Sequence, residues 1–447
     1  MAGVPQAGPW YKKEDYWAII IALGLVFVMT AAFYMGGTGF FKSMALSIPS
    51  WADGKDFGKV TAALTKNISG VFYLFGFFLI VFTIAARYLG HNIANFAMGF
   101  TVLYIISLII TVLGSNKTMK YWQLETPLLS LLFGMIVSNT MKLPEWFKPA
   151  LRTEFYVKTG IILMGATLPF TIILQAGPLA MLQATIVSVI TFGSIYWAAV
   201  YLFKLDPRFG ACLGAGGSIC GVSGSIAIGG ACRAEKEHVS VAISMVIIWA
   251  VVMIFLLPLW AKQLGMAPGP AGAWIGTSEF ADAAGFAAAE AMGDERATKT
   301  FTLMKVVGRD MFVGVWALLV AILSVTVWEK KSAADSERVN YGEVWNRFPK
   351  FVIGFFVASI FTTLIIASMN PKLGAAYSKD ILGPVKTLRA WTFTWTFLSI
   401  GFTTRFRELT SFGWKPLAAF AIGVAINVPL GYWLSNVVFV EYWLSIK

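Results

Sequence analysis

Long apolar runs separated by short polar segments dominate the chain. Each run is about 20 residues long, which at ~1.5 Å per residue matches the ~30 Å hydrocarbon core of a bilayer. The pattern predicts an all-α polytopic membrane protein with about 11 to 13 transmembrane segments. The eleven runs of spanning or near-spanning length cover residues 16–37, 69–90, 93–114, 124–141, 155–176, 178–203, 239–264, 300–328, 349–369, 388–404 and 416–440.

Two further segments are apolar enough to enter the membrane but are interrupted by small and polar residues. The first covers 209–232, and its stretch from Leu213 to Ala231 holds seven glycines and three serines. The second covers 272–293 and carries three acidic residues. Glycine costs a helix about 1 kcal/mol relative to alanine, so we expect both segments to be broken helices.

The sequence contains two internal repeats, each a pair of similar segments, and we call each pair an echo. Residues 160–178 resemble residues 396–416 at an offset of 236, and the two interrupted segments resemble each other at an offset of 60. A single apolar run separates the interrupted segments, so they would enter the membrane in opposite directions. The echoes predict the inverted-repeat architecture of secondary transporters, whose binding sites lie where broken helices meet.

Composition agrees with a membrane protein. Hydrophobic residues make up 57% of the 447 residues and charged residues 13%, about half the share in soluble domains. The formal net charge is +12, but no compact basic domain stands outside the apolar runs. We attribute the excess of Lys and Arg to loops that flank the membrane and meet anionic lipid, and we expect no nucleic-acid partner.

The residues that most enzymes and metal sites need are scarce. The three cysteines, Cys212, Cys220 and Cys232, form no Cys-x-x-Cys pair, and the only histidines are His91 and His238. Residues 221–224 spell the G-x-S-G of intramembrane serine proteases, but neither histidine is placed as a base for that serine. A phosphate-binding loop motif is also missing. We expect no enzyme activity, no metal and no cofactor beyond a proton or sodium as coupling ion.

The first interrupted segment is the leading candidate for substrate binding. Where a helix unwinds inside the membrane, free N–H groups, a helix N-terminus and hydroxyl groups can face an anion. The alternative is close helix packing through small residues. The candidate residues are Gly217, Ser218, Cys220, Gly221 and Ser223.

The second interrupted segment supplies hydroxyl and carboxylate groups. Thr277 and Ser278 are substrate-binding candidates, and Glu279 and Asp282 lie on one helical face beside them. A carboxylate in a membrane usually faces a cavity or a partner, so both are candidates for proton or cation coupling, Asp282 foremost. The alternative is that they only cap a helix end near water.

Three further places carry candidate groups. Lys305 and Arg309 are four residues apart on one helix face and could attract an oxyanion, or could instead extend to the membrane surface. Thr167 and the matching Thr403 are second-repeat candidates, because hydroxyl groups at a further helix end could complete a site.

Several motifs resemble the YeiH-type sulfate exporter family. They are K-T-G-I-I-L-M-G-A-T-L at 158–168, G-G-S-I-C-G-V-S-G-S at 216–225, G-A-W-I-G-T-S-E-F-A-D-A-A at 272–284, W-N-R-F-P-K-F-V-I-G-F at 345–355 and G-F-T-T-R-F-R-E-L at 401–409. The resemblance covers roughly residues 120 to 440. It implies a multi-pass carrier with inverted repeats in a bacterial cytoplasmic (inner) membrane, and the family name implies a sulfur oxyanion as substrate.

The resulting expectation is a secondary transporter of a small anion, such as sulfate, sulfite or a sulfonate, by alternating access around crossed broken helices. The alternative is a cation/proton antiporter or a sodium-coupled organic-anion carrier that uses Asp282. Residues 1–115 would be extra helices for a scaffold or oligomer contact, as in a homodimer. Residues 116–447 would form the transport domain, with a charged linker at 329–350. Membrane lipid is the other expected partner.

Overall fold

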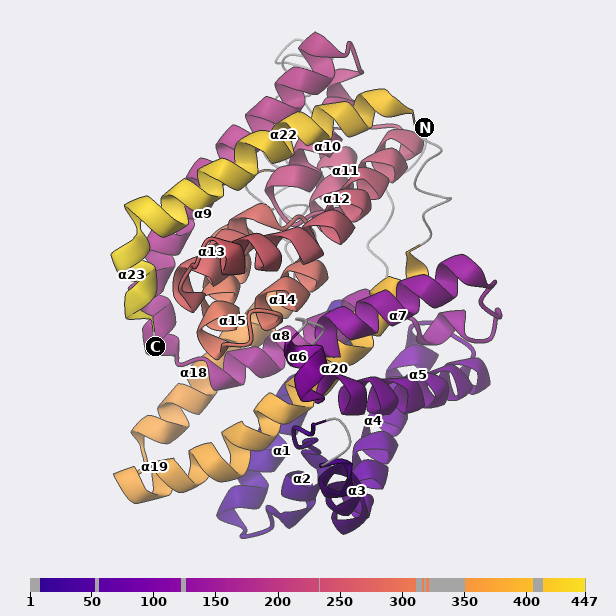
Figure 1. Ribbon diagram of the computed structural model, residues 1–447, viewed down its shortest axis with the longest axis vertical. Helices are drawn as coiled ribbons and strands as arrows, with labels where there is room; N and C mark the ends of the chain where they lie inside the picture. Colours follow the sequence, from indigo (N-terminus) through magenta and orange to yellow (C-terminus); the bar gives the residue numbers. More distant parts are fainter. Residues whose placement is uncertain are drawn as a thin grey trace. The chain divides into compact units, whose positions relative to one another are not determined.

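The computed structural model describes residues 9–446 except 53–55, 122–125, 233, 311–315, 317–318, 321–349 and 405–412. Across these residues the regular structure is helical, and strand-like pairing is limited to an isolated bridge between Trp51 and Asn116 (Figure 1). The chain is therefore an all-α protein, as predicted.

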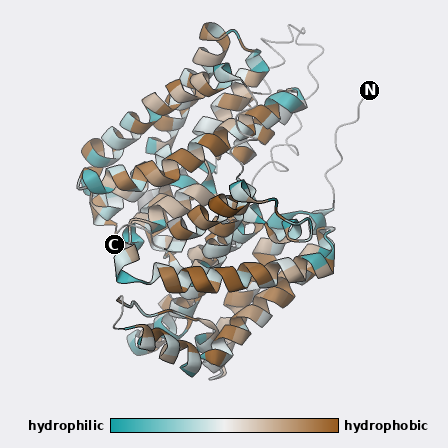
Figure 2. Ribbon diagram, turned by 45° about the vertical axis from the view of Figure 1, so that its right-hand side comes forward, coloured by the Kyte–Doolittle hydropathy of each residue, from teal (hydrophilic) through white to brown (hydrophobic). Residues whose placement is uncertain are grey.

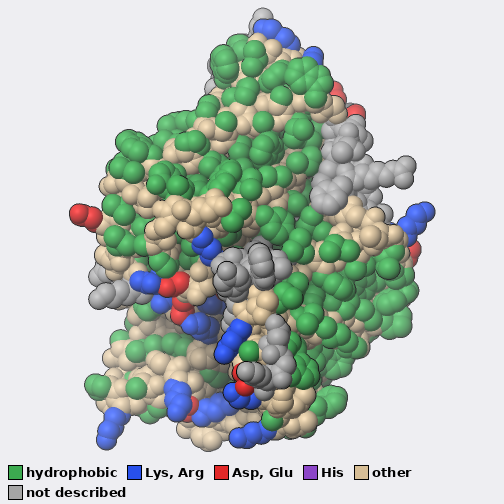
Figure 3. Space-filling model, in the orientation of Figure 1, with side chains coloured by type: hydrophobic (Ala, Val, Ile, Leu, Met, Phe, Trp, Pro, Cys, Tyr) green, Lys and Arg blue, Asp and Glu red, His purple; other side chains and the backbone are tan. Residues whose placement is uncertain are grey.

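Seven helices among the described residues are long and apolar enough to cross a membrane. They are Glu14–Tyr34, Ile68–Tyr88, Ile93–Gly114, Gly177–Leu202, Glu237–Gln263, Lys350–Ala367 and Trp414–Val438. Hydrophobic residues run along most of the length of the helices (Figure 2). They also cover much of the visible surface (Figure 3). Among the exposed apolar side chains, Phe72, Ile80 and Leu364 are more than 60% exposed. Such a surface fits lipid, and the chain is a multi-pass membrane protein.

The chain forms two compact units. The first contains residues 1–171 and 350–405. Its core is aromatic: Phe82 contacts Phe78, Phe100, Tyr156 and Trp395 with ring centroids 5.0–5.9 Å apart. Its α-helices are α1 (Glu14–Tyr34), α2 (Gly39–Met44), α3 (Phe57–Lys66), α4 (Ile68–Tyr88), α5 (Ile93–Gly114), α6 (Lys117–Tyr121), α7 (Thr126–Thr140), α8 (Thr153–Thr167), α18 (Lys350–Ala367), α19 (Pro371–Tyr377) and α20 (Gly383–Thr403).

The second unit contains residues 172–349 and 406–447 and holds both interrupted segments. Its α-helices are α9 (Phe170–Trp197, which starts in the first unit), α10 (Pro207–Ser218), α11 (Val222–Ala231), α12 (Lys236–Gln263), α13 (Pro268–Ser278), α14 (Asp282–Glu290), α15 (Glu295–Thr302), α22 (Trp414–Trp433) and α23 (Val440–Ser445). Three π-helical segments extend them: η3 (Ala198–Leu202), η4 (Leu303–Arg309) and η8 (Leu434–Val438).

The predicted domain boundary between residues 115 and 116 is not a boundary between the two compact units, since both residues fall inside the first unit. The assignment of residues 1–115 to a scaffold or an oligomer contact stays a prediction. The charged linker predicted at 329–350 lies, apart from Lys350, outside the described residues.

One predicted helix boundary was wrong. We expected helices at 155–176 and 178–203, but α8 ends at Thr167 and α9 runs from Phe170 through Pro178. A residue before proline is driven away from the helical region, and Leu168, which precedes Pro169, is extended at φ −106° and ψ 111°. Pro178 is accommodated inside α9, as proline often is in membrane helices.

Both predicted broken helices are confirmed. The first half of each ends at Ser218 or Ser278, and the second half starts at Val222 or Asp282. Each pair of positions differs by 60, the offset of the sequence echo. The two breaks therefore fall at equivalent positions of the repeat.

The echo at an offset of 236 also has a structural counterpart. The π-helical segments η3 and η8 begin at residues 198 and 434 and end at residues 202 and 438. Thr191 and Asn427 have the same offset and are hydrogen-bonded to each other at 2.9 Å. Equivalent residues of two copies meet where a local two-fold axis passes between them, so this contact supports the internal repeat.

The first break requires glycine at position 221 for two reasons. Gly221 has a φ of +69°, which side-chain-bearing residues rarely adopt. A Cβ atom there would also overlap the carbonyl oxygen of Phe280 in the second break. Gly265 shares a positive φ of +64° but has open space around it, with nothing within 4 Å.

We predict that Gly221→Ala lowers the thermal unfolding midpoint of the purified protein well beyond Gly265→Ala. Both variants carry the backbone strain, about 1–2 kcal/mol, but only the first forces the two breaks apart. Thermal unfolding in one detergent measures both midpoints. Equal shifts for the two variants would show that the breaks do not need to touch.

Candidate functional site

The site is the point where the two breaks meet inside the second unit. Residues 219–221 and 279–281 form the breaks, and the Gly221 backbone lies directly against the Phe280 carbonyl. The side chains of Ser218, Ser278 and Glu279 are fully buried there. Polar groups this deep in a membrane-length bundle are unusual unless they have a structural or binding role.

Arg309, the last residue of η4, holds the two breaks together. Its guanidinium donates to carbonyls at the ends of both interrupted helices, and Arg309 is only 1% exposed. The acceptors are Ser218 O (3.1 Å), Gly217 O (3.5 Å), Gly276 O (3.0 Å), Thr277 O (2.9 Å) and Glu279 O (3.2 Å). The last carbonyls of a helix have no partner within it, so the guanidinium satisfies them and opposes the negative ends of two helix dipoles.

Lys305 enters the same crossing from one turn earlier in η4. Its Nζ donates to Ile219 O and to Glu279 O, each at 3.3 Å, and lies 3.4 Å from Oδ1 of Asp282. Lys305 is fully buried, so it does not extend to the membrane surface as the alternative interpretation required. The two basic residues are brought together with both interrupted segments, as the substrate-binding hypothesis requires.

The two acidic candidates occupy different positions. Oε1 of Glu279 accepts hydrogen bonds from the amides of Phe280 (3.0 Å) and Ala281 (3.3 Å), whereas its buried Oε2 has no hydrogen-bond partner. Asp282 is the first residue of α14, and its side chain is 15% exposed. The N-cap of α14 is Ala281, so Glu279 binds the amides of the break itself and does not cap the helix.

The helices that begin at the breaks offer hydrogen-bond donors. Neither α11 nor α14 has a side-chain hydrogen bond at its N-cap. The first N–H groups of a helix have no partner within it and carry its positive dipole end. The buried hydroxyl of Ser218 also has no hydrogen-bond partner. The crossing therefore combines two helix N-termini, one lysine and one free hydroxyl, all of which can bind an oxyanion.

The other predicted residues of these segments differ in their packing and hydrogen bonding. Gly217 packs so closely on Ile195 that a Cβ would displace that side chain. Cys220 is buried within the first break, and the Thr277 hydroxyl donates to the Trp274 carbonyl at 2.9 Å. The side chain of Ser223 lies outside the described residues.

Sequence reasoning missed Asn427 on α22. Its side-chain amide donates to Thr191 Oγ1 at 2.9 Å and to Thr277 O at 3.1 Å, and its buried Oδ1 has no hydrogen-bond partner. Two features of the sequence could have identified it: Asn427 is a polar residue inside a long apolar run, and it lies 236 residues after Thr191, which is the offset of the first echo. Asn427 thus adds a further polar atom to the second break.

Thr167 and Thr403 belong to the first unit, whereas the crossing is formed by residues of the second. The Thr167 hydroxyl donates to the Met164 carbonyl (3.0 Å) and lies 3.2 Å from an Arg389 nitrogen. The Thr403 hydroxyl donates to the Ser399 carbonyl at 2.7 Å. Both hydroxyls are used near the ends of their own helices, and a substrate role for them stays a prediction.

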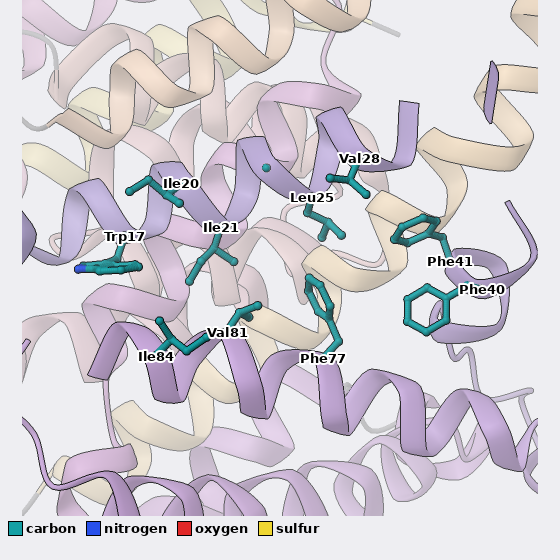
Figure 4. A pocket seen from close by; sticks show the side chains of 11 residues that line it. Trp17, Ile20, Ile21, Leu25, Val28, Phe40, Phe41, Phe77, Val81 and Ile84 are labelled. Carbon is teal, nitrogen blue, oxygen red and sulfur yellow. The ribbon is translucent and has the colours of Figure 1, made fainter. Parts of the chain in front are cut away.

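The first unit also contains an apolar cavity of about 470 Å³ between α1, α2 and α4 (Figure 4). Trp17, Leu25, Phe41 and Phe77 are among its eleven lining residues, and none of the eleven is charged. A small ion would lose its hydration there without compensation, so this cavity is unsuited to ion binding.

Similarity to known proteins covers most of the chain. A UPF0324 membrane protein of Rhodopirellula baltica is 33% identical over 397 residues, which are 86% of this chain and 72% of the relative. One from Nitratidesulfovibrio vulgaris is 32% identical over 364 residues, 80% of this chain but only 62% of that longer relative. The UPF0324 inner membrane protein YeiH of Salmonella typhimurium is 27% identical over 319 residues, covering 67% of this chain and 84% of YeiH.

No solved structure matches the chain. The family model described as "Conserved hypothetical protein 698" matches residues 98–420, which include both breaks, Lys305 and Arg309. The relatives confirm the resemblance to YeiH-type proteins, and this chain belongs to the UPF0324 family of membrane proteins.

Proposed function

We propose that this protein is a secondary carrier for a small oxyanion, which binds at the crossing of the two broken helices. The observation that carries the proposal is the convergence of Lys305, Arg309 and two uncapped helix N-termini on one buried point. Buried positive charge inside a membrane bundle is costly and is expected where an ion is handled. The membrane would be a bacterial inner membrane, as the name of the relative YeiH states for that protein.

The two basic residues have different roles in this proposal. The guanidinium of Arg309 is committed to carbonyls at both breaks, so it fixes the backbone and adds long-range positive potential. Lys305 has only long hydrogen bonds of 3.3 Å and an ion pair of 3.4 Å, so its ammonium group is the basic group that can turn toward a substrate. Substrate oxygens would bind this ammonium, the Ser218 hydroxyl, the first N–H groups of α11 and α14, and the amides of Phe280 and Ala281 in the second break.

Sulfate, sulfite and sulfonates are the substrate class that the proposal favours. Their several equivalent oxygens can accept hydrogen bonds from donors that approach from two helices. A carrier would alternate the access of this crossing between the two membrane faces. A binding screen on purified protein with sodium salts of sulfate, sulfite, methanesulfonate and acetate at constant ionic strength tests the class.

A cation/proton antiporter is the second candidate, because Asp282 is partly exposed and lies beside the buried Glu279. The same screen, repeated with potassium salts and at several pH values, separates the two functions. A carrier of oxyanions gains stability from an anion, by about 2.7 kcal/mol at a hundred times its Kd. Stabilisation by sodium or by pH with no response to any anion would favour the antiporter.

We predict that Ser218→Ala weakens binding of the anion found in that screen about tenfold. The variant removes one hydrogen bond to a charged group, and ~1.4 kcal/mol corresponds to a factor of ten. Isothermal titration measures the affinity. Ser244→Ala is the matched control, since that hydroxyl donates to the Ser240 carbonyl of its own helix, and unchanged affinity in both variants would place the site elsewhere.

We also predict that Arg309→Lys destabilises the folded protein. Lysine has three donors in place of five and lacks the planar fork, so Gly217 O and Gly276 O would lose charged hydrogen bonds, at about 1–3 kcal/mol each, whereas Ser218 O, Thr277 O and Glu279 O keep other donors. Arg296→Lys is the control, because Arg296 pairs with Asp294 at an exposed helix start and its replacement should change little. Comparable thermal midpoints for the two variants would contradict the role of Arg309.

A further inference from the structure

The charges at the crossing do not favour simple entry of an anion. Lys305 and Arg309 supply two positive charges, whereas Glu279, Asp282 and the buried Asp310 supply three negative charges when ionised, which leaves a net −1 among the described residues. A bound monovalent anion would make the region −2. Like charges interact strongly where water is excluded, so the site needs a way to lose negative charge.

Glu279 is the group whose surroundings fit that task. Its Oε1 already uses the Phe280 and Ala281 amides, which are donors that a substrate anion at the second break would need. Its Oε2 is buried with no hydrogen-bond partner, and so is the Ser218 hydroxyl of the adjoining break. The carboxylate therefore behaves as a built-in competitor for the anion, and protonation at Oε2 would remove its charge.

Neighbouring charged groups already have partners, which makes Glu279 the leading candidate to accept a proton. Lys305 and Arg309 from η4 contact its carbonyl, Asp282 pairs with Lys305, and Cys220 lies in the adjoining break. Lys262 and Arg296, on the helices packed against α13 and α14, are engaged in other contacts. Lys262 of α12 donates to the Ala291 carbonyl at 2.6 Å, and Arg296 of α15 pairs with Asp294 at 2.7 Å.

We propose that Glu279 takes up a proton when the anion binds, so that each anion is carried together with one proton. The proton comes from solution and adds to Oε2, which leaves Oε1 a neutral and weaker acceptor, so the anion can displace it from the two amides. This inference rests on the proposed function and names its coupling ion. Because binding consumes a proton, affinity rises as pH falls, by about tenfold per pH unit in the range where Glu279 is ionised in the free protein.

The experiment is isothermal titration of sulfate, and of methanesulfonate as a monovalent probe, into the full-length protein in lipid nanodiscs. Titration in two buffers of different ionisation enthalpy counts the protons taken up per anion bound. We expect about one for the unmodified protein. Glu279→Gln should bind without proton uptake and with an affinity independent of pH. Glu290→Gln, at the other end of α14, is the matched control and should retain the uptake.

The outcomes distinguish a failure of proton uptake by Glu279 from a failure of the proposed oxyanion transport. Anion binding without proton uptake in the unmodified protein overturns the inference and leaves the carrier intact. Absence of binding by sulfate and methanesulfonate at every pH overturns the carrier for these anions. Proton uptake that persists in Glu279→Gln assigns the proton to another group and also overturns the inference.

Difference infrared spectra keep the test open if Glu279→Gln does not fold. Sulfate added to the unmodified protein should produce the C=O band of a protonated carboxyl group, and Glu279→Asp should shift that band. A band that is missing, or unchanged in Glu279→Asp, contradicts the assignment.

Discussion

The hydrogen bonds from Arg309 to the carbonyls of two interrupted helices are the interaction on which the site depends. A helix that stops inside a membrane leaves carbonyl groups with no water to bond, and each unsatisfied group costs several kcal/mol, about the same as a lost hydrogen bond in an apolar medium. One planar guanidinium reaches carbonyls of both α10 and α13, at distances from 2.9 to 3.5 Å. Without such a group, either break alone would favour a continuous helix.

The Arg309 guanidinium brings a positive charge into the core, and this charge explains why other charged residues lie beside it. Lys305 adds a second cation, which shares the Glu279 carbonyl with Arg309 and also binds the Ile219 carbonyl, so carboxylates nearby are required to keep the region close to neutral. Glu279 and Asp282 meet this requirement from the second break. A cluster of this kind changes its net charge by one whenever a single proton is gained or lost, which makes it suitable for coupling ion movement to protons.

Sequence patterns were sufficient for the elements that depend on local backbone preference. The glycine-rich stretch and its echo located both breaks, because glycine and small residues weaken a helix wherever they lie. Features that depend on tertiary contacts were not accessible in the same way. The depth of Lys305 and Arg309 follows from where η4 packs, and an apolar run with two basic residues near its start also describes a helix end at the membrane surface. Asn427 gave no local signal beyond its polarity, since its partners are 236 and 150 residues away.

The internal repeat explains the geometry of the crossing but not its chemistry. At the offset of 60, Ser278 matches Ser218 and Ala281 matches Gly221, so both copies have a small residue at each end of the break. Glu279 and Asp282, in contrast, match Ile219 and Val222, which carry no charge. A symmetric pair of breaks would present two equal helix N-termini, whereas the acidic residues make the second copy alone able to hold a proton. The duplicated backbone thus creates a place for an ion, and the difference between the copies decides which ion can be exchanged there.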